Sequence, residues 1–183
     1  MMKKVDAKVA LSPIPLVVIG SEFDGKVNYI TVAYTGLLDS QTILVSLGKI
    51  QYSNKGLKEN MTMSINIPSE EMVAKADYVG LVSGAKVDKS SVFESFYGDL
   101  KGAPMIKGAS ACMECEVVEI IEMPNHNVYV CKVKNTYWNE NSLIENNVDI
   151  SLAKPLLFDI YQRKYLKVGD VLADAWSIGK SLL

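Results

Sequence analysis

Alternation of apolar and polar residues dominates the chain and predicts β-strands. The clearest case runs from Met61 to Ile67, where methionine and isoleucine alternate with threonine, serine and asparagine. Successive side chains of a strand point to opposite faces, so this period of two places the apolar residues on one face. Val5 to Leu11 has the same pattern and predicts a first strand. Leu16 to Ile19 is entirely apolar, which predicts a strand covered on both faces.

Further strands are expected at residues 28–34, 42–47, 112–121, 127–136 and 156–160. Within 112–121 the alternation slips at Val117 and Val118, which predicts a β-bulge.

Helical patterns are short and lie mostly in the middle of the chain. Ser69 can cap a helix whose first turn holds two glutamates and whose apolar stripe reaches Val79, with Gly80 or Gly84 ending it. A second short helix is expected from Asp88 to Phe96, and a third over residues 53–60. Many short strands with inserted helices predict one antiparallel barrel. No G-x-G-x-x-G opens a helix after a strand, so a Rossmann domain has no support.

Composition narrows the class of protein further. The chain has 183 residues, of which 49% are apolar and 22% charged, as expected for one globular domain. Nineteen lysines and arginines against 21 acidic residues give a net charge of −2, which argues against nucleic acid as a partner. The apolar runs fall far short of the roughly 20 residues of a membrane span. The N-terminus lacks the pattern of a secretory signal, so we expect a cytoplasmic protein that does not bind membranes.

Cys112 and Cys115 form a C-x-x-C that invites a redox or zinc interpretation. Residues three apart in a strand face opposite sides, so the two thiols are not expected to pair or to share a metal. His126 is the single histidine and cannot complete a four-ligand zinc site alone. We therefore expect Cys112, Cys115 and Cys131 to be free thiols and expect no metal.

Three polar segments are candidates for a binding site. N-Y-I-T-V-A-Y, starting at Asn28, carries Asn28 and Thr31 in a strand, or is a half-buried strand whose polar residues face water. S-L-G-K-I-Q-Y-S-N-K, starting at Ser46, leads to a helix start at Ser53 that suits a phosphate, or is an ordinary capped turn. S-G-A-K-V-D-K, starting at Ser83, offers a glycine and two lysines, or is a solvated loop.

The order of these motifs resembles a known family. N-x-x-T-V-A-Y, S-L-G-x-x-x-Y-S, I-N-I-P-S-E-E-M-V, S-G-x-K-V-D-K, and A-P-M-I followed by M-E-C-E-V-V-E resemble the flavin reductase-like family of the FMN-binding split barrel superfamily, especially its flavoredoxin group. The closing stretch from Arg163 to Lys180 is similar to the tail of that group.

The resemblance implies a mainly β, six-stranded antiparallel Greek-key split barrel with short peripheral helices, forming a homodimer. Residues 1–183 would be one FMN-binding domain, with 155–183 as a tail that covers the site or the dimer interface. NADH or NADPH would be the co-substrate, and a redox partner protein the acceptor. The positions that match the family's flavin site are Asn28, Thr31, Val32, Ala33, Ser46, Leu47, Tyr52, Ser53, Lys89, His126 and Tyr161.

The flavin would carry the redox chemistry, so no catalytic side chain is expected. This agrees with a sequence that has no Ser-His-Asp set and no paired carboxylates at useful spacing. Two alternatives remain open at this point. One is an FMN-carrying electron-transfer protein that does not oxidise NAD(P)H itself, and the other is a non-enzymatic split barrel that binds another ligand.

Overall fold

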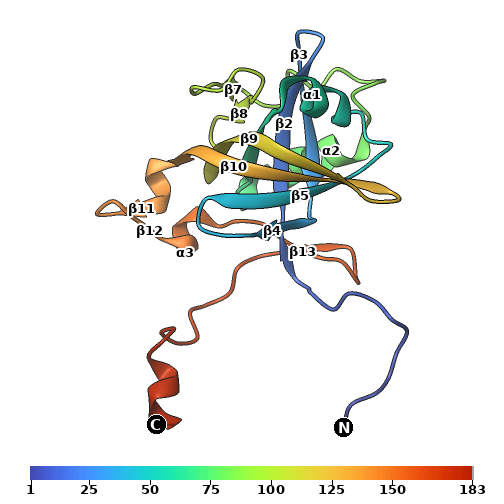
Figure 1. The fold of residues 1–183 in the computed structure, drawn as a ribbon. Coiled ribbons are helices and arrows are strands. Elements are labelled where there is room, and N and C mark those ends of the chain that lie inside the picture. The colour runs from blue at the N-terminus through green and yellow to red at the C-terminus, as the bar shows by residue number, and fades with distance from the viewer. Residues whose placement is uncertain (183) are drawn as a thin grey trace.

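The computed structural model describes residues 1–182 and consists of one curled antiparallel sheet with short helices around it (Figure 1). The sheet has seven strands in the order β3-β2-β6-β9-β10-β5-β4. Six of them are long and the seventh, β4, adds three residues to one edge. Their bounds are β2 Val17–Phe23, β3 Lys26–Val32, β4 Thr35–Leu37, β5 Thr42–Gly48, β6 Thr62–Ile67, β9 Ala111–Glu122 and β10 His126–Trp138.

Smaller elements surround the main sheet. A second sheet joins β1 to the hairpin β13–β14, and two further two-stranded pairs are β7–β8 and β11–β12. The helices are short, and α2 follows directly on η1. The bounds are β1 Ile14–Pro15, β7 Ser95–Phe96, β8 Met105–Ile106, β11 Leu143–Ile144, β12 Asn147–Val148, β13 Leu157–Asp159, β14 Lys164–Leu166, α1 Asn54–Asn60, α2 Val73–Leu81, α3 Ile150–Ala153, η1 Glu70–Met72, η2 Glu140–Ser142 and η3 Ile178–Leu182.

The main sheet closes because its two edge strands are neighbours in sequence. β3 and β4 stand at opposite ends of the strand order, yet Ala33 and Tyr34 alone separate them in the chain. The sheet must therefore curl until its edges meet, and β3 also contacts β5. The amide of Ser46 on β5 donates to the carbonyl of Tyr34 (2.8 Å) and holds this junction. The antiparallel split barrel expected from the resemblance is thus the observed architecture.

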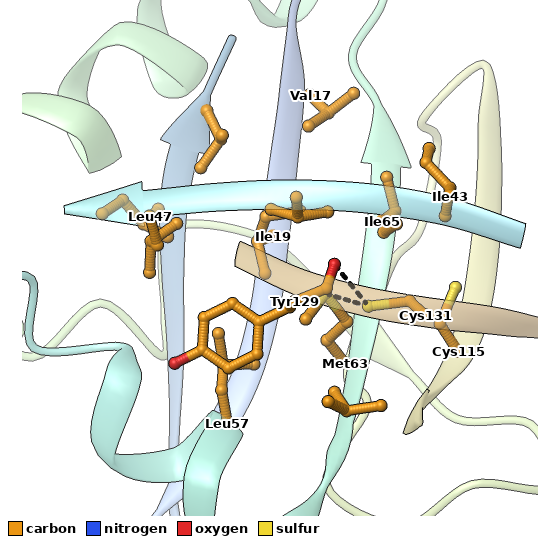
Figure 2. Packing of buried hydrophobic residues seen from close by; sticks show 14 residues of the cluster. Val17, Ile19, Ile43, Leu47, Leu57, Met63, Ile65, Cys115, Tyr129 and Cys131 are labelled. Atoms are coloured by element: carbon orange, nitrogen blue, oxygen red, sulfur yellow. Dashed lines mark hydrogen bonds between the residues drawn. The ribbon is translucent and has the colours of Figure 1, made fainter. Parts of the chain in front are cut away.

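Strand β2 separates two apolar clusters. Val17 and Ile19 belong to the barrel interior, where Figure 2 shows them with Met63, Ile65 and Tyr129. Leu16 and Val18 face the other way, into a cluster under α2. The entirely apolar run at residues 16–19 is therefore covered on both faces, as the sequence predicts.

The prediction for the C-x-x-C stretch is also confirmed. Cys115 lies in the barrel interior and Cys112 in the cluster on the other face of β9. All three cysteines are buried free thiols. The pairing of β9 with β10 skips Val118, since Val130 pairs with Glu119 and Cys131 with Val117. The expected bulge is present at this position.

Two predicted elements are wrong. Val5 to Leu11 forms no strand, because in one copy of the chain this segment has no neighbouring strand to pair with and its side chains are exposed. The stretch from Asp88 to Phe96 forms turns and the short strand β7 instead of a helix. The carboxylate of Asp88 accepts the amide of Ser90 (2.8 Å) and closes a tight turn, while the side chain of Lys89 is drawn into the interior.

The other helices occur close to where they are expected. α1 covers residues 54–60 and ends at Met61 in the left-handed conformation. η1 and α2 follow Ser69, but the Ser69 side chain makes no capping hydrogen bond. Over residues 1–182 no helix is long and apolar enough to cross a membrane.

Candidate functional site

A cleft of about 200 Å³ lies where the two edges of the sheet meet. The end of β3 and its connection to β4 form one wall, and the end of β5 forms the other. The residues that line it are Ile30, Thr31, Val32, Ala33, Tyr34, Ser46, Leu47, Gly48, Gln51, His126 and Phe158. The barrel closure thus creates the cleft, because strand pairing stops at the β3–β4 connection.

Two backbone amides at this junction are free. Among residues 1–182, the N–H groups of Ala33 and Tyr34 have no hydrogen-bond partner, while the carbonyls of both residues accept bonds. The hydroxyl of Thr31 donates to the carbonyl of Ala76 on α2, which fixes that side chain. A cleft with unpaired donors beside apolar walls can hold a flat, partly polar ligand.

Aromatic side chains frame the opening of the cleft. The rings of Tyr34 and His126 lie 6.3 Å apart at an interplanar angle of 55°. Tyr34 is 57% exposed, so it stands at the outer rim. Phe158 reaches the cleft from the distant hairpin β13–β14 and packs on Tyr165, with 5.9 Å between ring centroids.

Besides the free amides of Ala33 and Tyr34, a second polar group lies nearer the start of β3 and consists of Asn28, Tyr52 and Ser53. The amide nitrogen of Asn28 donates to the hydroxyl of Ser53 (2.7 Å), and both residues are buried. The side-chain oxygen of Asn28 is buried and has no partner within the described chain. Gly84 packs against Asn28 and the Tyr52 ring so closely that a Cβ atom there would overlap both side chains. A buried acceptor without a donor costs free energy unless a ligand or water supplies the bond.

The two polar groups are connected by the same two segments of chain. Asn28 precedes Thr31 by three residues of β3, a distance of roughly 10 Å along a strand. On the other side, Gln51 lines the cleft and is followed directly by Tyr52 and Ser53. The second polar group therefore lies next to the cleft along both segments, although the side chains of Asn28 and Thr31 face opposite sides of β3.

Lys89 lies outside the cleft. Its buried ammonium donates to the carbonyls of Tyr29 on β3 and Val79 in the last turn of α2, each at 2.8 Å. It thereby joins the free edge of β3 to the C-terminal end of α2. Burial lowers the pKa of Lys89 to about 8.

Tyr161 and Arg163 stand in the turn between β13 and β14. Both are exposed, and the Tyr161 hydroxyl donates to the carbonyl of Val9 in the N-terminal segment. Neither residue lines the cleft, whereas Phe158 of the same hairpin does.

The structure thus divides the predicted site residues into three sets. Thr31, Val32, Ala33, Ser46, Leu47 and His126 meet in the cleft, and Asn28, Tyr52 and Ser53 form the second polar group. Lys89 and Tyr161 lie apart from both. Ile30, Tyr34, Gly48, Gln51 and Phe158 line the cleft but were not among the predicted site residues. The first four lie inside the quoted motifs, but no local signal marks Phe158, because its position depends on how a distant hairpin packs.

The fold and the cleft together define a split β-barrel with a cleft at the seam of its sheet. Among residues 1–182 no cluster of side chains suits a metal ion. Residues 10–168 match the model of the flavin reductase like domain, and the chain belongs to this family.

Comparison with solved structures supports the same family assignment. The chain is similar to the crystal structure of flavoredoxin from Methanosarcina acetivorans, with 38% identity, complete coverage of both chains and a TM-score of 0.96. It is also similar to flavoredoxin of Desulfovibrio vulgaris, with 30% identity, coverage of 98% of this chain and 100% of that one, and a TM-score of 0.90. A protein of Aeropyrum pernix is 26% identical over 132 residues, which are 69% of this chain and 50% of that protein. The chain spans about half the length of this relative.

Proposed function

We propose that this protein is an FMN-dependent oxidoreductase that moves electrons from NAD(P)H through bound FMN to an acceptor. The observation that carries the proposal is the cleft at the sheet seam, where two unpaired amides stand beside apolar walls. Membership in the flavin reductase-like family supports a flavin as the ligand.

The residues present fit an isoalloxazine ring at the cleft. A flavin presents carbonyl oxygens and ring nitrogens along one edge, and these accept hydrogen bonds from amides such as those of Ala33 and Tyr34. Its other edge is apolar and suits contact with Leu47 and Phe158.

The second polar group fits the ribityl phosphate chain. The unpartnered oxygen of Asn28 needs a donor, and ribityl hydroxyls are donors. The hydroxyl of Ser53 accepts from Asn28 and is left free to donate to a phosphate oxygen. A dinucleotide-binding fingerprint is absent from the sequence, so we propose FMN and not FAD.

When bound, the flavin supplies the chemistry, because it accepts a hydride or single electrons without help from a side-chain acid or base. The chain binds and orients the ring through the Ala33 and Tyr34 amides. Phe158 covers the cleft from the hairpin side and Tyr34 from the rim, which limits access of water to the bound ring.

A spectrum and a reconstitution test the cofactor. We expect apoprotein to regain a flavin spectrum with FMN and to bind FAD and riboflavin at least about tenfold more weakly. Ala33→Arg fills the cleft and should abolish binding. Ala74→Arg, on the exposed face of α2, is the matched control and should bind normally. Preference for FAD, or equal binding by both arginine variants, would contradict the proposal.

Anaerobic mixing with NADH or NADPH tests the electron source. Bleaching of the bound flavin by either nucleotide supports a reductase. The likeness to flavoredoxins supports a second candidate, an electron carrier that a partner protein reduces. A flavin that dithionite bleaches but neither nucleotide does would favour the carrier.

We also propose that the protein acts as a homodimer and passes its electrons to a redox partner protein. Tyr34 is exposed at the rim of the cleft, where a second macromolecule can contact it. Sedimentation of the purified protein measures the first point directly.

A further inference from the structure

A separate cavity of about 220 Å³ lies at the start of α1, on the side that faces β10. Ser53 contacts β3 through Asn28, whereas the next residue, Asn54, contacts β10 through Asn127. The cavity, here called the lysine pocket, is lined by residues of the turn after β5, of α1 and of the β9–β10 hairpin: Lys49, Asn54, Lys55, Lys58, Glu122 and Asn127. None of them lines the cleft.

The buried part of the lysine pocket is a pair of asparagines whose orientation is fixed. The side-chain nitrogen of Asn54 donates to the carbonyls of Gly48 (2.9 Å) and Gln51 (2.8 Å). Its oxygen accepts from the hydroxyl of Tyr129 (2.6 Å) and from the side-chain nitrogen of Asn127 (2.8 Å). Turning the Asn127 amide over would set two oxygens against each other, so its nitrogen must face Asn54.

The side-chain oxygen of Asn127 is left without a hydrogen bond. Asn127 is 2% exposed, and this oxygen is buried and has no partner within the described chain. A buried acceptor in this state costs free energy until a donor from outside the chain reaches it. Because Asn127 lines the lysine pocket, a ligand there can supply that donor.

The outer part of the lysine pocket carries more positive than negative charge. The one carboxylate in its lining, Glu122, is shared by Lys58 (3.3 Å) and Lys49 (3.6 Å). The hydrogen bond from Lys58 and the charge of Lys49 hold the pKa of Glu122 below its usual 4.5, so Glu122 is charged at neutral pH. Lys55 has no carboxylate partner among residues 1–182. Three ammonium groups against one carboxylate leave two positive charges for a ligand to neutralise.

The buried acceptor and the free positive charge together define a class of ligand. A phosphate monoester carries a charge of roughly −2 at neutral pH and three terminal oxygens, which suit these lysines better than a singly charged carboxylate does. The oxygen of Asn127 requires a hydroxyl close to that phosphate. The volume of about 220 Å³ lies below the roughly 300 to 1,000 Å³ of pockets for drug-sized ligands, so the pocket suits one such group and not a whole cofactor.

We propose that the lysine pocket is a second binding site, separate from the flavin site, for a phosphate monoester whose neighbouring carbon bears a hydroxyl group. Lys49, Lys55 and Lys58 bind the phosphate, and the hydroxyl donates to the side-chain oxygen of Asn127. A free sugar phosphate has this chemistry, and so does the 2′-phosphate of the adenosine ribose in NADPH. The site does not rest on the proposed function, whereas its use by NADPH does.

The first experiment is calorimetric titration of the purified chain with adenosine 2′-monophosphate, whose phosphate stands beside a 3′-hydroxyl. This compound should bind at least about tenfold more tightly than adenosine, and higher salt should weaken its binding by screening the lysines. Lys49→Gln with Lys58→Gln leaves the lining without net charge and should weaken binding at least about tenfold. Lys132→Gln with Lys134→Gln removes the same charge from an exposed part of β10 outside the pocket and should bind normally.

The second experiment tests the contact with Asn127. The 3′-deoxy analogue of adenosine 2′-monophosphate keeps the phosphate but lacks the hydroxyl, so the wild type should bind it about tenfold more weakly. Asn127→Ala should bind the two compounds equally, because the acceptor is gone while the lysines remain. A merely structural role of Asn127 would weaken both compounds alike. The wild-type comparison tests the contact even if this variant does not fold.

The third experiment identifies the source of the phosphate. If it belongs to NADPH, Lys49→Gln with Lys58→Gln should slow bleaching of the bound flavin by NADPH and leave bleaching by NADH unchanged. Tighter binding of glucose 1-phosphate than of NADP⁺ would assign the site to a free sugar phosphate. The same variant should bind FMN normally, because the phosphate of FMN is proposed to lie at Ser53.

Four results overturn this second site. Adenosine 2′-monophosphate binds no more tightly than adenosine, the two lysine variants bind it alike, the wild type does not distinguish the 3′-deoxy analogue, or Lys49→Gln with Lys58→Gln loses FMN affinity. The last result would place the flavin's own phosphate in the pocket. A chain that binds adenosine 2′-monophosphate but no flavin would contradict the proposed function and leave this site in place.

Discussion

The loop from Gly98 to Leu100 and the cleft beside Ala33 both take polar groups out of water, but they pair those groups differently. The carboxylate of Glu114 on β9 is fully buried and accepts from the amides of Asp99 (3.2 Å) and Leu100 (2.8 Å) and from the side chains of Asn135 and Tyr137. Gly98 lies against it where a Cβ atom would overlap Glu114 and Tyr137.

The cleft region has the opposite character. The Asn28 oxygen and the amides of Ala33 and Tyr34 lack partners within the described chain. Where every donor and acceptor already has a partner, the hydrogen bonds stabilise the fold, and a ligand has no missing bond to supply. A region with unmatched groups gains free energy when a ligand supplies the missing bonds.

The largest effect on stability is expected at Glu114, where every donor and acceptor has a partner. Glu114→Ala leaves the loop amides without an acceptor and should lower the free energy of unfolding by roughly 3 kcal/mol. Urea denaturation measures it. Glu119→Ala, exposed on the same strand, should change stability by less than about 0.5 kcal/mol. Equal losses of unfolding free energy in both variants would show that the hydrogen bonds of Glu114 do not stabilise the fold.

The Glu114 network also predicts acid lability. Burial raises the pKa of Glu114, but the bonds from Asn135, Leu100, Asp99 and Tyr137 outweigh it, so the pKa lies below its usual 4.5. The folded state therefore binds this proton less readily than the unfolded chain. Stability from Glu114 is complete above the unfolded pKa and is lost as the pH falls through the folded pKa.

Lys89, which lies apart from both regions, gives a smaller effect on stability that depends on pH. Because burial lowers its pKa from 10.5 to about 8, the unfolded chain binds more protons between these values, and stability rises with pH there. Relative to Lys89→Met, the wild type should gain about 2 kcal/mol between pH 7.5 and pH 9.5. Buried thiols such as Cys112, whose pKa burial raises to about 11, work in the opposite direction in both proteins. If the stability of the wild type and of Lys89→Met changed with pH in the same way, Lys89 would not be desolvated in the folded protein.

Gly84→Ala tests the second polar group by flavin binding. The added methyl displaces Asn28 and Tyr52, so FMN affinity should fall about tenfold, or about 1.4 kcal/mol. Gly169→Ala is the control, because a Cβ atom there meets no other residue. Titration of apoprotein with FMN by fluorescence quenching measures both. An unchanged affinity would exclude Asn28 and Tyr52 from the FMN site.

The smallest effect is expected from the thiols. Cys112→Ala with Cys115→Ala removes two groups that face different apolar clusters and do not line the cleft. Flavin affinity and any NAD(P)H oxidation should change by less than about twofold, although stability falls through lost packing. A rate loss of more than about tenfold would restore a redox role to the C-x-x-C.

What the sequence determined by itself is local. The pleat of a strand sets a period of two, so the six long strands, the bulge at Val118 and the opposite faces of Cys112 and Cys115 follow from the order of apolar and polar residues. The two motifs that start at Asn28 and Ser46 also contain most of the residues that line the cleft, because they lie at two strand ends that close the sheet.

The tertiary structure decided everything that depends on a distant partner. The alternating segment from Val5 to Leu11 forms no strand, because a strand needs a neighbour and this chain offers none. Phe158 reaches the cleft through the packing of a remote hairpin. Lys89, a loop lysine by its local sequence, is buried because an edge strand and a helix end present two carbonyls to it. Pleat and turn geometry act over a few residues, whereas these contacts join residues far apart in the chain.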